Sequence, residues 1–217
     1  MKHVLNFLKE LENNNSKQWF DLNKDAYINA KTIFENKITE VIDELKKFDS
    51  SIEKNLEAKH CVYRIYKDVR FSKDKTPYKI NMGASINPGG KKSGKAGYYI
   101  HIQNNASFVA GGIYMPNPLA LNNIRQEIDY NNKFFIKTLS SPTFTTYFKG
   151  LNTIDKLKTT PKGYDANNPM IEYLKHKHFI ASHALSNNVI KSEQFVTTVN
   201  DAFKAIKPLI LFLNNAI

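Results

Sequence analysis

The amino-acid sequence predicts an α+β fold, in which a central antiparallel β-meander sheet is flanked by N-terminal and C-terminal helices. The spacing of apolar residues is helical over the first fifty residues, changes to a period of two from about residue 62, and becomes helical again after about residue 116. The connections inside the period-two region are too short for crossover helices, which favours a meander. We therefore expect one domain over 1–217, with a helical part at 1–50, an antiparallel sheet at 60–116 and a helical part at 117–217.

The first fifty residues are expected to form two or more helices. An apolar face is formed by Val4, Leu5, Leu8 and Leu11, and the polar run 13–16, Asn-Asn-Asn-Ser, can cap a following helix. A second apolar stripe at helical spacing contains Tyr27, Ala30, Phe34, Ile38, Val41, Ile42 and Leu45. We interpret Trp19-Phe20 as an anchor that packs the helices against the sheet.

Four segments have the pattern of strands. Apolar and polar residues alternate in 62–71, 80–87 and 98–103, as expected for strands with one buried face. A fourth run, 107–115, is apolar on both faces and is interrupted by two glycines. Turn-forming residues lie between the runs, at 74–77, 88–90 and 104–105.

The remainder of the chain is expected to be mostly helical. Asn117 can cap a helix that has Pro118 at its first position. Further helices are expected at 132–140, 168–177 and 192–214, with a loop at 159–165.

The chain is basic, and the excess charge is concentrated in one segment. The formal net charge is +11, with 41% hydrophobic and 24% charged residues, which is ordinary for a globular protein. Residues 1–58 carry nine basic and eleven acidic residues, residues 59–95 carry ten and two, and residues 96–217 carry twelve and seven. The abundance of Lys and Asn throughout the chain favours compositional bias as the cause of the overall charge. Such bias explains the concentrated basic segment less well, and this segment favours an anionic partner.

The predicted strand 62–71 carries the densest group of chemically useful side chains. Arg64, Tyr66, Asp68 and Arg70 occupy alternate positions, so we expect two guanidinium groups and the carboxylate between them on one side of the sheet. Arginine binds phosphate or carboxylate through a planar fork, and an aspartate between two arginines can orient them. The alternative interpretation is an Arg–Asp–Arg network that only braces the sheet.

The basic region resembles a known family. The run 64–79, RIYKDVRFSKDKTPYK, is similar to the hallmark of the family catalogued as domain of unknown function 2461. The resemblance covers nearly the whole chain. It extends to blocks at Asn14-Asn15, Trp19-Phe20, Gly97-Tyr98-Tyr99 with His101, Gly111-Gly112, Pro116, Arg125 and Pro161-Lys162-Gly163-Tyr164. The resemblance implies the α+β fold of that family and brings no established activity.

Other motifs are rejected. The run 89–96, GGKKSGKA, approaches a P-loop, but Ala96 replaces the hydroxyl residue that would bind Mg²⁺ and strands flank the run. His176, His178 and His183 match no zinc spacing, so neither a metal nor a cofactor is expected. Cys61, the only cysteine, is expected to be a buried structural thiol in a reducing compartment.

Two functions remain open, and catalysis is left undecided. The first is binding of a small phosphate- or carboxylate-bearing ligand, with His101 and Asp68 as candidates for proton transfer. The second is a module for nucleic acid or an acidic partner, in which segments 72–79 and 88–95 bind phosphates and tyrosines stack on bases. The candidate ligand-binding residues are Arg64, Tyr66, Asp68, Arg70, Lys73, Lys75, Tyr78, Lys79, Tyr99, His101 and Lys162.

The location and partners follow from the same sequence. No apolar run near Met1 has the length of a signal peptide, and the apolar stretch 208–213 is too short to span a bilayer. We therefore expect a cytoplasmic protein without a membrane partner. The sequence leaves its oligomeric state open.

Overall fold

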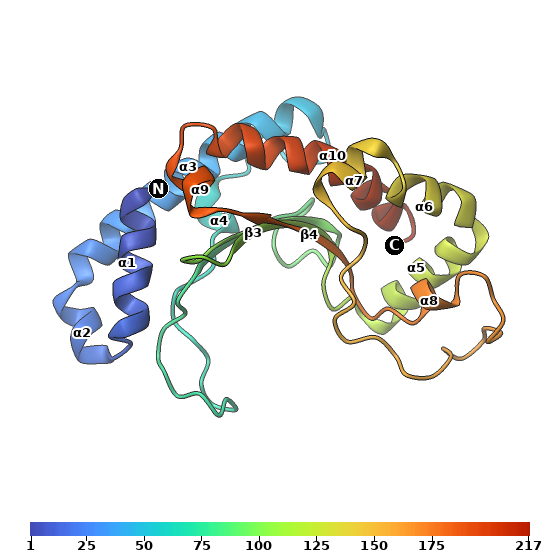
Figure 1. The fold of residues 1–217 in the computed structure, drawn as a ribbon, viewed down its shortest axis with the longest axis horizontal. Helices are drawn as coiled ribbons and strands as arrows, with labels where there is room; N and C mark the ends of the chain where they lie inside the picture. Colours follow the sequence, from blue (N-terminus) through green and yellow to red (C-terminus); the bar gives the residue numbers. More distant parts are fainter. The chain divides into compact units, whose positions relative to one another are not determined.

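The computed structural model describes all residues 1–217 and confirms the α+β fold (Figure 1). Four strands form one antiparallel sheet in the order β1-β2-β3-β4. The strands are β1 (Met82–Ile86), β2 (Gly97–Ile102), β3 (Ser107–Ile113) and β4 (Phe179–Leu185). The first three match the predicted runs closely.

Helices precede and follow these strands along the chain, as predicted. The first four are α1 (Lys2–Asn13), α2 (Lys17–Leu22), α3 (Lys24–Phe48) and α4 (Ala58–Cys61). The others are α5 (Pro118–Tyr130), α6 (Asn132–Leu139), α7 (Pro142–Tyr147), α8 (Ile171–Leu174), α9 (Asn187–Lys191) and α10 (Phe195–Asn215). No helix is both long enough and apolar enough to cross a membrane.

Contacts within the chain define two compact units, each assembled from separate segments. The first consists of Met1–Ile86, Tyr99–Val109 and Ala184–Asp201. The second consists of Asn87–Tyr98, Ala110–His183 and Ala202–Ile217. The strands β2, β3 and β4 each contribute residues to both units.

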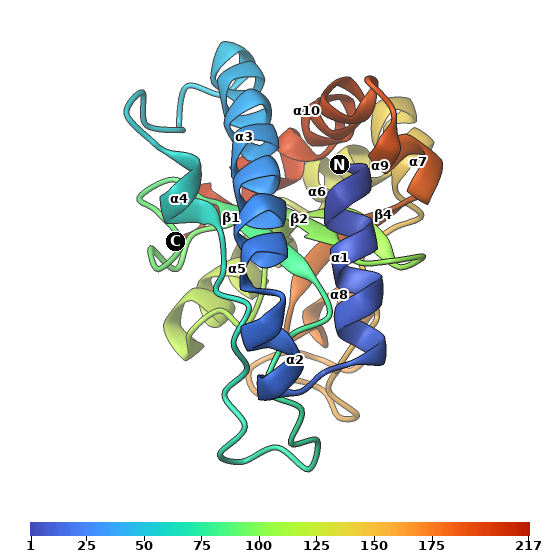
Figure 2. The same ribbon diagram turned by 90° about the vertical axis from the view of Figure 1, so that its left-hand side faces the viewer.

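The first unit contains the helical pair that the N-terminal apolar stripes predict. Figure 2 shows α1 alongside α3, and the two helices are in contact. The predicted apolar positions of α1 are all buried, and so is the stripe of α3 from Ala30 to Leu45. Ser16 caps α2, because its Oγ accepts a hydrogen bond from the Trp19 amide at 3.2 Å. Phe20 is fully buried, as expected of an anchor, whereas Trp19 is half-buried.

The second unit contains α5 to α8, parts of β2, β3 and β4, and α10 from Ala202 onward. Gly111 lies so close to α10 that an added Cβ would be 2.8 Å from the Ile206 side chain. Tyr98 packs on Phe203 of the same helix, with ring centroids 4.8 Å apart. The predicted cap of α5 is confirmed, since Asn117 Oδ1 accepts from the Ala120 amide at 2.9 Å.

Two parts of the prediction for the chain after residue 165 are corrected. The helix expected at 168–177 is reduced to the single turn α8. The strand β4 was not predicted, and its alternation of buried and half-buried positions is irregular at Ser182, His183 and Ala184. His176 therefore follows α8, and His183 lies on β4.

Candidate functional site

The segment 62–81 is an irregular hairpin, and the prediction of a strand at 62–71 is wrong. Only two isolated bridges form, Val62 with Ala84 and Tyr66 with Tyr78. Pro77 has no amide to donate, and the Asp74 carboxylate accepts from the Thr76 amide at 2.9 Å. Such local bonds compete with a strand ladder, so the chain leaves the sheet here. Figures 1 and 2 both show this segment as a long loop between α4 and β1.

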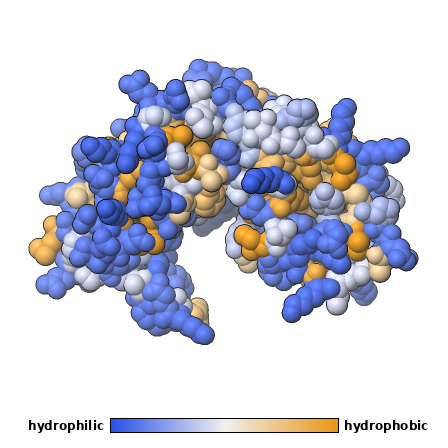
Figure 3. Space-filling view, viewed as in Figure 1, coloured by the Kyte–Doolittle hydropathy of each residue, from blue (hydrophilic) through white to orange (hydrophobic).

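Loss of the strand separates the side chains that were expected to share one face. Asp68 and Arg70 bind each other at the tip of the hairpin, through Nε–Oδ1 and Nη2–Oδ2 distances of 2.9 and 2.6 Å. Both side chains are exposed, and Arg70 lowers the pKa of Asp68 through its hydrogen bond. This pair does not brace the sheet, because both of its members are exposed on the hairpin. On the face that Figure 3 shows, the hairpin is coloured mainly as hydrophilic.

The two tyrosines of the hairpin have different surroundings. Tyr78 is only 3% exposed, and its ring stacks on Phe20 with centroids 4.0 Å apart. Tyr66 is 42% exposed and packs at an angle against the same two rings. Tyr78 is therefore part of the core and anchors the hairpin. It has no face left for a ligand.

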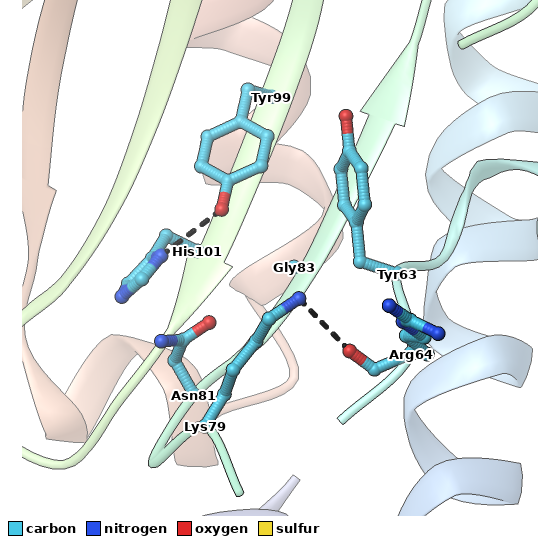
Figure 4. A pocket seen from close by; sticks show the side chains of 7 residues that line it. All are labelled: Tyr63, Arg64, Lys79, Asn81, Gly83, Tyr99 and His101. Carbon is cyan, nitrogen blue, oxygen red and sulfur yellow. Dashed lines mark hydrogen bonds between the residues drawn. The ribbon is translucent and has the colours of Figure 1, made fainter. Parts of the chain in front are cut away.

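Arg64, at the base of the hairpin, lines a pocket. The pocket has a volume of about 430 Å³ and lies on the polar face of β1 and β2. Its lining residues are Tyr63, Arg64, Lys79, Asn81, Gly83, Tyr99 and His101 (Figure 4). All of them belong to the first unit.

The strand β2 presents the pocket residues because its side chains alternate. Tyr98, Ile100 and Ile102 are fully buried on one face, while Tyr99 and His101 are half-buried on the other. Asn81 and Gly83 likewise alternate with apolar residues in the segment 80–87, which contains β1, and both line the pocket. The sequence pattern therefore placed Tyr99 and His101 on the correct face.

Two cations border the pocket, and no carboxylate lines it. Lys79 Nζ donates to the backbone carbonyl of Arg64 at 3.0 Å and lies 5.7 Å from the centre of the Tyr63 ring. Burial lowers the pKa of Lys79, and repulsion by Arg64 lowers it further. The guanidinium of Arg64 and the side-chain amide of Asn81 have no hydrogen-bond or ion-pair partner in the chain.

The side chains of Tyr99, His101 and Gln103 form a row of hydrogen bonds beside the pocket. Tyr99 Oη lies 3.1 Å from His101 Nδ1, and His101 Nε2 lies 3.0 Å from Gln103 Oε1. Phe108 stacks on the imidazole with centroids 4.6 Å apart, which fixes the plane of the ring. Burial lowers the pKa of His101, opposed by its bond to Gln103, so the imidazole is neutral at pH 7. Burial also raises the pKa of Tyr99 to about 12.

Four of the sequence-predicted residues thus come together: Arg64, Lys79, Tyr99 and His101. Lys73 is exposed, and Lys75 donates to the Val69 carbonyl at 3.0 Å at the tip of the hairpin. Lys162 is exposed in a loop of the second unit. Sequence reasoning missed Tyr63, Asn81 and Gly83. The last two were visible as polar positions of a strand run whose neighbour carries Tyr99 and His101.

The remaining candidates for chemistry are structural. Cys61 is buried, as predicted, and its thiol donates to the Glu57 carbonyl at 3.7 Å. Tyr114 stacks on His178 with centroids 4.6 Å apart, and His183 Nδ1 lies 2.9 Å from the carbonyl of Tyr147. These contacts give each of the two imidazoles a packing role.

Comparison with known proteins gives one match. A family model described as a conserved hypothetical protein (DUF2461) matches residues 3–212. No curated protein matches the chain, and no solved structure matches it.

Proposed function

We propose that this chain, which belongs to the DUF2461 family, binds a small phosphate- or carboxylate-bearing molecule in the pocket between Arg64 and His101. Arg64 and Lys79 would bind the anion, and Asn81 would add a neutral hydrogen-bonding group. Asp68 and Arg70, which the sequence suggested as ligands, take no part in this proposal because they neutralise each other in solvent.

The observation that carries the proposal is the unneutralised pair of cations. The chain contains 20 acidic residues, yet neither Arg64 nor Lys79 has a carboxylate within ion-pair distance. Elsewhere in the chain acids pair with neighbouring bases, as Asp74 does with Lys67 at 2.7 Å, whereas Arg64 and Lys79 border one pocket that no acid lines. Two like charges at one pocket repel each other, and a bound anion would remove that repulsion.

The size of the pocket supports a small ligand. Ligand pockets in proteins span roughly 300–1,000 Å³, and the volume of about 430 Å³ lies at the lower end of that range. The walls are formed by the rings of Tyr63 and Tyr99, whose centroids are 6.4 Å apart. A long polyanion would contact the rim of such a pocket but would not fill it.

The proposal includes a cytoplasmic location. The chain has a single cysteine, Cys61, and its thiol is buried and reduced. A protein that relies on no disulfide fits a reducing compartment.

The test is a titration with inorganic phosphate and with citrate, followed by NMR shifts of the pocket amides and by calorimetry. We expect Arg64→Gln or Lys79→Gln to weaken binding about 10- to 100-fold, since each removes a charge-assisted bond. Arg70→Gln is the matched control, because it removes one positive charge from an exposed residue that lies close to Arg64 in sequence but does not line the pocket. An equal loss of affinity in all three variants would show that binding depends only on the net charge of the protein, and it would overturn the proposal.

The nucleic-acid alternative predicts a different pattern. Binding of single-stranded DNA by the hairpin would fall with Arg70→Gln and Lys73→Gln, and it would weaken steeply with salt. Two observations disfavour it. Tyr78 is buried and offers no stacking face, and two of the hairpin cations, Lys67 and Arg70, are paired with Asp74 and Asp68.

A further inference from the structure

We propose that the anionic ligand of this pocket also carries a hydroxyl or amine group, whose hydrogen is accepted by Tyr99 Oη. The inference rests on the proposed function and names the class of ligand more narrowly. The preferred ligands would be polyol phosphates, hydroxy acids or amino acids, and simple alkyl phosphates or carboxylates would bind less well.

The direction of the hydrogen bonds in the chain from Gln103 to Tyr99 carries this inference. Gln103 presents its carbonyl oxygen, Oε1, to His101 Nε2 at 3.0 Å, so Nε2 bears the proton and donates it. A neutral imidazole has only one N–H, and Nδ1 must therefore be an acceptor. Tyr99 Oη, at 3.1 Å, donates its only hydrogen to Nδ1.

A tyrosine whose hydrogen is already committed can only accept further bonds. The hydroxyl of Tyr99 lies among the pocket residues and points toward His101 (Figure 4). An anionic oxygen placed there would face the lone pairs of Oη and be repelled. A ligand O–H or N–H group would be bound, and Oη would then have both a donor and an acceptor partner.

The surroundings hold this arrangement in place. Stacking on Phe108 prevents the imidazole from rotating out of the plane that joins Tyr99 to Gln103. The cations Arg64 and Lys79 border the same pocket, so the ligand's anionic group has its own site there. The two recognition elements therefore select for two different groups on one molecule, an anion and a hydrogen-bond donor.

Propyl phosphate and glycerol 3-phosphate are suitable probes, because they share a three-carbon chain and differ in two hydroxyl groups. We expect the wild-type protein to bind glycerol 3-phosphate about three- to tenfold more tightly, the effect of one net hydrogen bond. Tyr99→Phe should abolish this preference, so that the two probes bind this variant with equal affinity. His101→Phe keeps the ring stack but removes the acceptor, so Tyr99 could donate to the phosphate and propyl phosphate should bind more tightly.

The outcomes separate this inference from the proposed function. If wild-type protein binds both probes equally, or if Tyr99→Phe retains the preference, the inference is overturned and anion binding stands. If neither probe binds, or if Arg64→Gln binds both probes as tightly as the wild-type protein does, the proposed function itself is overturned. Cooperative unfolding of each variant, measured in urea, ensures that a loss of binding is not a loss of the fold.

Discussion

The hydroxyl of Tyr99 lies directly over the backbone of Gly83, on the neighbouring strand. A Cβ added to Gly83 would be 2.6 Å from Tyr99 Oη and 3.2 Å from Cζ of the same ring, far inside van der Waals contact. Gly83 does not have a positive φ, so its role is steric and not conformational. The absence of a side chain at Gly83 is what allows the phenol to lie flat against β1 and reach His101.

Gly83→Ala should therefore displace the Tyr99 ring and break its bond to His101. We expect the free energy of unfolding to fall by about 1–3 kcal/mol, the usual cost of forcing an extra methyl group into a packed site. The hydroxyl makes the closest contact, so the same substitution should cost less in a Tyr99→Phe background. A double-mutant cycle in urea measures this coupling. Additive effects would show that the two residues do not contact each other in solution.

Asn15 holds the hairpin by pairing with the backbone of Tyr78. Its Nδ2 donates to the Tyr78 carbonyl at 2.9 Å, and its Oδ1 accepts from the Tyr78 amide at 3.1 Å, as a neighbouring strand would do. Asn15→Ala should lower the free energy of unfolding by about 1–3 kcal/mol, the sum of two net hydrogen bonds. Amide exchange should accelerate at Tyr78 and at Lys67, whose amide donates to the Pro77 carbonyl within the same hairpin.

Asn14→Ala is the matched control for this prediction. The Asn14 side chain donates only to the Glu10 carbonyl of its own helix, and the bond is exposed. We expect exchange in the hairpin to be unchanged in this variant. Faster exchange at Tyr78 in both variants would indicate general loosening of α1 and would contradict the specific role of Asn15.

Much of the fold was predictable because local patterns were strong. The strand 98–103 alternates in sequence, and Tyr98, Ile100 and Ile102 are indeed fully buried. The cap and proline at 117–118 set the start of α5 at the predicted residue. The strand β4 was missed because its polar residues Ser182 and His183 break the alternation, and its place beside β3 depends on contacts distant in sequence.

The site was predictable only in part, for a related reason. Alternation over 62–71 suggested a strand. In the structure the carboxylates of Asp68 and Asp74 accept hydrogen bonds from nearby backbone amides, and only two isolated bridges form in place of a continuous strand ladder. Arg64 and Arg70 were consequently grouped together although only Arg64 lines the pocket. Asn81 and Gly83 were overlooked because their partnership with Tyr99 depends on strand register, which a single sequence does not specify.

Arg125 joins α5 to the chain around α8 inside the second unit. Its side chain is buried, and it donates to the carbonyls of Leu174 at 2.7 Å and His176 at 3.3 Å. Arg125→Met should leave both carbonyls unpaired and lower the free energy of unfolding by about 1–3 kcal/mol. Lys133→Met, at an exposed position of α6, removes the same charge as a control. A similar loss in both variants, measured by urea unfolding, would assign the effect to net charge.

His101 should make stability depend on pH in a definite direction. Its pKa is lowered in the folded protein, mainly by burial, from an ordinary value of about 6.5. At pH values between the lowered pKa of His101 in the folded protein and its ordinary pKa in the unfolded chain, the unfolded chain binds more protons than the folded one. The free energy of unfolding should therefore fall as the pH is lowered below about 6.5. The groups facing the imidazole are Tyr99, Gln103 and Phe108, and none of them supplies a carboxylate that would reverse this sign.

His176 has a pKa shifted in the same direction, so the two histidines must be separated experimentally. NMR titration of the imidazole protons assigns a midpoint to each ring, and we expect the His101 midpoint below its ordinary value. Urea unfolding of His101→Phe between pH 7.5 and 5.0 should then show a smaller loss of stability than the wild type, because one proton-linked group is gone. An unchanged pH dependence would mean that His101 is solvated, and the direction of the Tyr99 hydrogen bond would have to be reconsidered.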